Sequence, residues 1–386
     1  MNDRVFTEDI TYTTSTSENP DPNFAYDLCM LSHVGNVRDE NQDYRGFKKI
    51  GNKSFIIVCD GMGGHSGGFE ASRLATQVMI EYFEQNHTFS AFDILLQSIK
   101  KANKVVYDYG RQNPKLQGMG TTVVAGILEG NTLRLAHVGD SRAYLIRKNH
   151  VNLLTFDHSQ VYDLVRKNFM TFEAAEVDEN NNVLLCALGV AEELPIPDSQ
   201  IISNKEMQLA YGDKILLCSD GLHGVPNFYE KLLSEMLIGN IHINAQTAKL
   251  MDFAIKRVDQ GFLADDNVTI SILHYKGTQK NTMLTPDVRD QYRQKNTSAQ
   301  TQVLPTDQPY STQPFDLPRK TTPPPKNQNT LYMAIAGVVV IVAFVLFGLW
   351  PADDDKGKAS KSGAKTQEEA DDNDSKSNGN DGDVND

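Results

Sequence analysis

Several aspartates of this chain lie where an apolar run gives way to a turn. Asp60 follows the apolar run 54–59 and opens D-G-M-G-G-H, and Asp140 and Asp220 lie in G-D-S-R and C-S-D-G. The same context recurs at Asp43, in R-D-E-N-Q-D, and at Asp265 and Asp266, in A-D-D-N-V-T. A carboxylate beside an apolar core is costly unless it is paired or bound to a cation. No nearby run of Lys or Arg could neutralise this many carboxylates.

Divalent cations can neutralise such a set. Hard cations such as Mg²⁺ take oxygen ligands and need only a few carboxylates. Gly61 adds a backbone carbonyl that no side chain obstructs. A single aspartate in a turn more often stabilises the turn or caps a helix. The repetition of one context along the chain favours a metal site instead.

The elements that must position these residues follow from hydrophobic periodicity. The pattern predicts a buried strand at 54–59, helices at 70–85 and 91–109, and strands at 121–128, 133–138, 143–147, 215–218 and 268–274. A strand, two helices and then closely spaced strands indicate an α+β fold with antiparallel sheets. They do not fit a doubly wound parallel sheet.

Composition divides the chain into five parts. We expect a disordered polar segment at 1–25, one folded domain at 26–275, a linker at 276–330 and an acidic disordered tail at 351–386. The linker holds eight of the chain's 15 prolines. Residues 331–350 carry no charge, are long enough for a membrane-spanning helix, and place Tyr332 and Trp350 at the interfaces.

Charge and cysteine usage limit the partners and the compartment. The net charge of −13 excludes nucleic acid as an expected partner, because phosphate backbones need a basic surface. The four cysteines are far apart and are predicted to be buried structural thiols in a reducing compartment. The N-terminus shows no apolar export signal. We therefore expect a single-pass protein of the cell membrane, with the folded domain in the cytoplasm and the tail outside.

Eight stretches of the folded domain resemble one known family, the metal-dependent protein phosphatases of type 2C in their bacterial form. They are V-G-N-V-R-D-E-N-Q-D (34–43), V-C-D-G-M-G-G-H (58–65), M-G-T-T (119–122), V-G-D-S-R-A-Y (138–144), L-T-F-D-H-S (154–159), A-L-G (187–189), L-C-S-D-G-L (217–222) and D-D-N (265–267). The resemblance covers about residues 27–275. It implies a four-layer α-β-β-α sandwich of two antiparallel sheets, with the metals at one end.

The resemblance also implies a ligand set for Mn²⁺ or Mg²⁺. Asp60 would bridge two metal ions, and Asp220 and Asp266 would complete the first site. The Gly61 carbonyl and Asp43, directly or through a water, would hold the second ion.

Further roles follow from the same resemblance. Asp140, together with Asp220, would hold a weaker third metal, and Arg38 would bind the substrate phosphate. A metal-bridging hydroxide would attack phosphorus in line, hydrolysing phosphoserine and phosphothreonine in proteins. The expected partners are phosphorylated proteins, with a cognate serine/threonine kinase and its substrates.

Two positions depart from the eukaryotic pattern of the family. Gln42 stands where many relatives have Glu, and Met62 stands where animal members place a His thought to protonate the leaving group. A metal-bound water is then the expected proton donor. Residues 160–200 resemble the variable flap beside the active site, with short helices at 162–166 and 171–175.

Two other functions stay open at this point. A pseudophosphatase scaffold would bind phosphoproteins at the membrane without hydrolysis, but the presence of Asp60, Asp220 and Asp266 favours an enzyme. A phosphatase of a small phosphoester is the other alternative.

Overall fold

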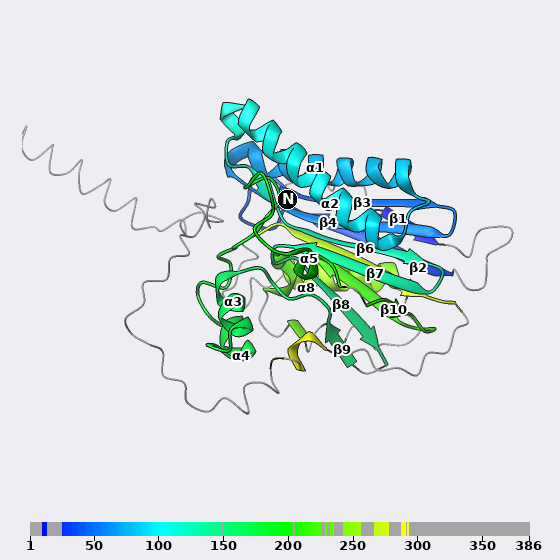
Figure 1. Ribbon diagram of the computed structural model, residues 1–386. Helices are drawn as coiled ribbons and strands as arrows, with labels where there is room; N and C mark the ends of the chain where they lie inside the picture. Colours follow the sequence, from blue (N-terminus) through cyan, green and yellow to red (C-terminus); the bar gives the residue numbers. More distant parts are fainter. Residues whose placement is uncertain are drawn as a thin grey trace, which may run out of the picture. The chain divides into compact units, whose positions relative to one another are not determined.

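The computed structural model describes residues 10–13, 25–148, 150–203, 205–224, 228–229, 232, 234, 242–255, 266–277, 287–290 and 292. The chain divides into two units, residues 1–324 and 325–386, and every described residue lies in the first. Figure 1 shows its strands with the two long helices, α1 (Gly64–Asn86) and α2 (Ala91–Gln112), lying together along one side.

Two antiparallel sheets form the centre of the described residues, which confirms the predicted α+β fold. In the first sheet the strands lie in the order β1 (Ile10–Thr13), β2 (Tyr26–His33), β12 (Val268–Tyr275), β11 (Lys214–Cys218), β8 (Arg142–Arg147) and β9 (His150–Leu153). In the second sheet the strands lie in the order β10 (Met207–Gln208), β7 (Thr132–Val138), β6 (Val123–Glu129), β4 (Lys53–Met62) and β3 (Asp43–Ile50). The short strand β5 (Gly120–Thr121) also pairs with β4.

Alternate side chains of β4 pack into two different hydrophobic clusters. Phe55 and Ile57 pack into the cluster that includes α1 and α2, whereas Ile56 and Val58 pack between the two sheets. Successive strand residues point to opposite faces, so a strand buried on both sides is apolar throughout. The second sheet therefore lies between the helices and the first sheet.

Shorter helices cover the outer face of the first sheet. They are α3 (Gln160–Arg166), α4 (Phe172–Glu176), α6 (Asp220–His223) and α8 (Ile243–Ile255), and α8 contacts β2 and β12. Helix α5 (Asp198–Ile201) and a 3-10 turn (Pro114–Leu116) lie elsewhere in the domain. Among the described residues the layer order is helix, sheet, sheet, helix.

Helix α1 begins at Gly64, six residues before the start that periodicity predicts. Gly63 precedes it with a φ of 130°, and a Cβ added to Gly61 would lie 2.0 Å from the Gly68 carbonyl oxygen. The end of β4 and the first turn of α1 thus touch through their backbones, which only glycine allows. Apolar spacing could not place this start, because residues 64–68, G-H-S-G-G, contain no large apolar residue to mark a buried face.

Two short pieces differ from the predicted organisation of the chain. Residues 10–13, assigned to a disordered segment, form β1 and extend the first sheet by pairing with β2. Residues 287–290 and 292, assigned to the linker, lie against the folded domain. Each gains backbone or aromatic partners from distant parts of the chain, which local composition does not show.

No helix among the described residues is long and apolar enough to cross a membrane. The predicted helix at 331–350, the tail at 351–386, Asp265 and most of the linker lie outside the described residues.

All four cysteines are buried and free, as the sequence predicted. Burial raises the pKa of both Cys59 and Cys186 to about 12, so neither thiol is a nucleophile near neutral pH.

The first prediction concerns these thiols. The native protein should not react with a water-soluble disulfide reagent within minutes at pH 7, because burial keeps the reagent out. Denaturation in guanidinium should expose all four thiols, and absorbance at 412 nm counts them. Rapid labelling of the native protein would contradict the buried placement.

Candidate active site

Two buried carboxylates face each other where β3 begins and β4 ends. Asp43 and Asp60 are directly paired positions in the antiparallel ladder, and both side chains are almost fully buried. Like charges directly opposite each other destabilise a sheet. Such a pair requires a nearby cation or a shared proton to remain folded.

The first sheet contributes a third carboxylate to the same end of the domain. The Ser219 hydroxyl donates a hydrogen bond of 2.7 Å to Asp43 Oδ2, and Ser219 lies between the end of β11 and Asp220 at the start of α6. The Thr269 amide donates to Ser219 Oγ at 2.9 Å, which fixes the hydroxyl from β12. Asp43 and Asp220 therefore reach this end from different sheets.

Asp266 lies two residues before β12, next to Asn267, whose side chain bonds to two neighbouring loop segments. Asn267 Oδ1 accepts from the Gln42 amide at 2.8 Å, and Asn267 Nδ2 donates to the carbonyls of Val34 and Glu40. The Arg38 guanidinium donates to Asp266 Oδ2 at 3.0 Å. Arg38 and Asp266 are thus held together, with about a fifth to a quarter of each side chain exposed.

Asp140 lies between β7 and β8 and is joined to Asp60 through a hydroxyl chain. The Thr122 amide donates to the Asp60 carbonyl at 2.8 Å, and Thr122 Oγ1 lies 2.7 Å from Ser141 Oγ. On the other side, His223 Nε2 lies 3.0 Å from the Asp140 carbonyl oxygen. Helix α6 therefore positions both Asp220 and the backbone that carries Asp140.

The donor chemistry at this end fits a hard divalent cation. The predicted ligands offer carboxylate and carbonyl oxygens, which Mg²⁺ and Mn²⁺ prefer. The Gly61 amide donates to the Gln42 carbonyl at 3.1 Å, and a Cβ on Gly61 would lie 2.6 Å from that oxygen. The absence of a side chain at Gly61 keeps its backbone in close contact with the Asp43 loop.

The described residues contain no three His, Cys, Asp or Glu side chains already gathered around one point. The structure brings Asp43 opposite Asp60, joins Asp43 to the Asp220 turn, and pairs Asp266 with Arg38. The assignment of metal ligands stays a prediction for Asp43, Asp60, Gly61, Asp140, Asp220 and Asp266. The phosphate-binding role of Arg38 stays one as well.

Met62 forms part of an apolar wall of the site. It is buried against Leu184 and Ala187, which come from the segment after α4. Its thioether has no proton to donate, so Met62 cannot replace a histidine as a general acid. The short helices predicted within residues 160–200 are confirmed as α3 and α4.

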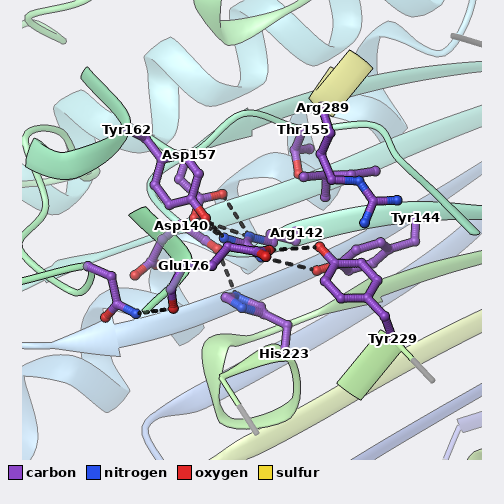
Figure 2. A network of polar contacts seen from close by, with 12 residues as sticks. Asp140, Arg142, Tyr144, Thr155, Asp157, Tyr162, Glu176, His223, Tyr229 and Arg289 are labelled. Carbon is purple, nitrogen blue, oxygen red and sulfur yellow. Dashed lines mark hydrogen bonds and ion pairs between the residues drawn. The ribbon is translucent and has the colours of Figure 1, made fainter. Parts of the chain in front are cut away.

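A buried ionic network centred on Arg142 lies close to Asp140, as Figure 2 shows. Arg142 Nε and Nη2 bind both oxygens of Asp157 at 2.8–3.1 Å, and Nη2 also donates to the Tyr162 hydroxyl at 2.6 Å. Burial opposes charge on Arg142, yet Asp157 holds the pKa of the guanidinium well above its ordinary value. Asp157 lies just before α3 and Tyr162 lies within it, so these contacts of Arg142 fix α3 relative to β8.

Sequence reasoning singled out the aspartates but not the residues that orient them. Ser219, Thr122 and Asn267 all lie in the quoted motifs, and each hydrogen-bonds the backbone or the carboxylate of a neighbouring element. For Ser219 and Asn267 the neighbouring aspartate was the available signal, and for Thr122 it was the M-G-T-T motif, although Ser, Thr and Asn are common in turns for other reasons.

The chain is similar to known proteins in both sequence and fold. The sequence pattern of one family, Protein phosphatase 2C, matches residues 33–253. The serine/threonine phosphatase stp of Listeria monocytogenes is 32% identical over 251 residues, which span 64% of this chain and 94% of that protein.

Solved structures show the same architecture. The serine/threonine phosphatase of S. agalactiae superimposes with a TM-score of 0.57 at 28% identity, covering 65% of this chain and all of that one. The catalytic domain of the serine/threonine protein phosphatase PstP, solved with two manganese ions, gives a TM-score of 0.53 at 28% identity, covering 64% and 97%.

Proposed function

The chain belongs to the bacterial branch of the protein phosphatase 2C family and is a serine/threonine protein phosphatase, and we propose that it works through Mn²⁺ or Mg²⁺ at the cytoplasmic face of a membrane. The observation that carries the metal proposal is the pairing of buried Asp43 with buried Asp60. The solved relative with two manganese ions supports it.

Asp60, Asp220 and Asp266 would hold one ion, and Asp60, Gly61 and Asp43 the other. Asp140 and Asp220 would hold a weaker third ion. When bound, the ions supply Lewis acidity that lowers the pKa of the attacking water and offsets charge on the phosphoryl oxygens.

The chain's own residues carry out the remaining tasks. Arg38 would bind two phosphoryl oxygens with its planar fork, because it lies beside Asp266 at the site and is partly exposed. Ser219 holds the Asp43 carboxylate, and Thr122 holds the backbone that carries Asp60. Met62 and Leu184 keep an apolar surface beside the site, which strengthens electrostatic interactions there.

The substrates would be phosphorylated proteins, including those of a cognate serine/threonine kinase. The uncharged run 331–350 would anchor the chain, with the catalytic domain on the cytoplasmic side. A substrate close to the membrane suits that arrangement, because the linker limits how far the domain can travel.

The second prediction tests the metal centre. Hydrolysis of an aryl phosphate should need Mn²⁺ or Mg²⁺ and should stop in excess chelator. Asp60→Asn should lower kcat by about a hundredfold or more, because it removes the predicted bridging charge. Asp108→Asn, on the exposed face of α2, is the control and should keep wild-type activity.

Full activity in chelator, or in Asp60→Asn, would rule out this centre. A properly folded wild-type protein that binds phosphoproteins but hydrolyses nothing would instead indicate the pseudophosphatase. Hydrolysis of small phosphoesters with no activity on phosphoproteins would indicate the other alternative.

The third prediction concerns Arg38. Arg38→Ala should raise KM by about tenfold or more, since a phosphate-binding side chain acts in the ground state too. Arg38→Lys should raise KM by less, and the control Arg73→Ala on α1 should leave KM unchanged. Steady-state kinetics at saturating Mn²⁺ measure the split between KM and kcat. An unchanged KM would show that Arg38 does not bind the phosphate and serves Asp266 alone.

The fourth prediction concerns topology. Protease added outside spheroplasts should remove a tag placed after Asp386 and leave the catalytic domain intact, because the run 331–350 would separate them. Immunoblotting against the tag and the domain reads the result, and detergent lysis is the control. Digestion of the domain with survival of the tag would reverse the proposed orientation.

A further inference from the structure

A short segment beyond the family match lies on the edge of the first sheet. Asp287 Oδ2 accepts from the Leu153 amide at 3.3 Å, and Arg289 Nη2 donates to the Val151 carbonyl at 2.8 Å. The Arg289 side chain also binds both oxygens of Asp287. Strand β9 is the edge of its sheet, so this segment satisfies backbone groups that an edge leaves open. We call residues 287–290 and 292 the docked segment.

The docked segment reaches α3 and α4 through aromatic rings. The Tyr292 ring stacks on Phe156, with centroids 4.4 Å apart and an angle of 27°. The Phe156 ring in turn packs near two rings of the short helices. Its centroid lies 5.6 Å from that of Tyr162 in α3 and 6.5 Å from that of Phe172 in α4. Tyr292 therefore supports the ring on which both helices pack.

Polar contacts also connect the docked segment to α4 and β8. The Arg289 guanidinium lies 4.5 Å from the centre of the Tyr229 ring. The Tyr229 hydroxyl donates to Glu176 Oε1 at 3.2 Å, at the end of α4, and that oxygen lies 3.7 Å from Arg142 Nη1. Figure 2 places these side chains around one another. The docked segment is thus joined to Arg142, two residues after Asp140.

The segment that carries α3 and α4 begins and ends beside the proposed metal centre. At its start, the His158 amide donates to the Gly139 carbonyl at 2.9 Å, next to Asp140. At its end, Leu188 pairs with Thr121, whose hydroxyl donates to the Asp60 carbonyl at 2.9 Å. We call residues 159–187 the site wall. A shift of α3 and α4 would reach both ends of the wall.

We propose that the docked segment is a clasp that holds the site wall in the position that accepts phosphorylated proteins, with Arg289 and Tyr292 as specificity-determining positioning residues. This inference rests on the proposed phosphatase function. A phosphoprotein extends over the rim of the site, whereas a small aryl phosphate reaches only the metal centre and Arg38. Phe169 and Val177 of the wall are 42% and 85% exposed, so the wall leaves apolar side chains open to solvent.

The test uses the full chain with Mn²⁺ and compares Arg289→Ala and Tyr292→Ala with two controls. Arg111→Ala removes another arginine that lies over a tyrosine ring, at the end of α2, and Tyr211→Ala removes a tyrosine that is 71% exposed. The substrates are p-nitrophenyl phosphate and casein phosphorylated on serine and threonine. Hydrogen exchange of residues 160–176 is measured on the same proteins.

Arg289→Ala and Tyr292→Ala should raise KM for phosphorylated casein by about five- to tenfold and leave kcat/KM for the aryl phosphate within about twofold. Exchange in residues 160–176 should become faster, and in α1 it should not. Both controls should match wild type on every measurement.

An unchanged KM for casein would overturn the clasp, and so would an equal loss on both substrates, which marks a purely structural contact. If wild type hydrolysed neither substrate, the proposed function would fail separately. The exchange rates of residues 160–176 would still decide whether the docked segment holds the wall, and unchanged rates would reject it.

Discussion

The structure depends on one unfavourable contact, the direct opposition of Asp43 and Asp60 in a buried position of the β3–β4 ladder. A sheet that only needed stability would not place two carboxylates there, because neighbouring like charges in a low-dielectric interior repel strongly. The surrounding elements act to keep the pair in place. Ser219 holds Asp43, Thr122 holds the Asp60 backbone, and the glycines at 61 and 68 let β4 and α1 touch.

Both sheets supply the site, which explains why its residues are so far apart in sequence. Asp43 and Asp60 come from the second sheet, and the Asp220 turn and Asp266 come from β11 and β12 of the first. The apolar cluster between the sheets fixes the distance between these strand ends, because packed interiors resist sliding. Amino-acid changes at the outer edge, where β9, the docked segment and the site wall meet, can therefore be tolerated without moving the carboxylates.

The sequence predicted what has a local signal. The alternation of β4, the periodicity of α2 and the aspartates in glycine turns all follow from residue order, and the structure has the strands and helices close to the expected bounds. The start of α1 was missed because glycines leave no apolar pattern. Strand β1 and the docked segment were missed because their partners, Cys29 and Phe156 among them, lie far along the chain. The Arg38–Asp266 pair also depends on two loops meeting in space, which spacing alone does not encode.

The most direct test of this account is thermal unfolding of wild type and Asp60→Asn with and without Mn²⁺. Without metal the variant should unfold at a higher temperature, because one of two opposed buried charges is gone. Saturating Mn²⁺ should raise the Tm of wild type and barely change that of the variant, since a ligand stabilises only the state that binds it. A wild type that is more stable than Asp60→Asn without metal, and whose Tm Mn²⁺ does not change, would contradict the account.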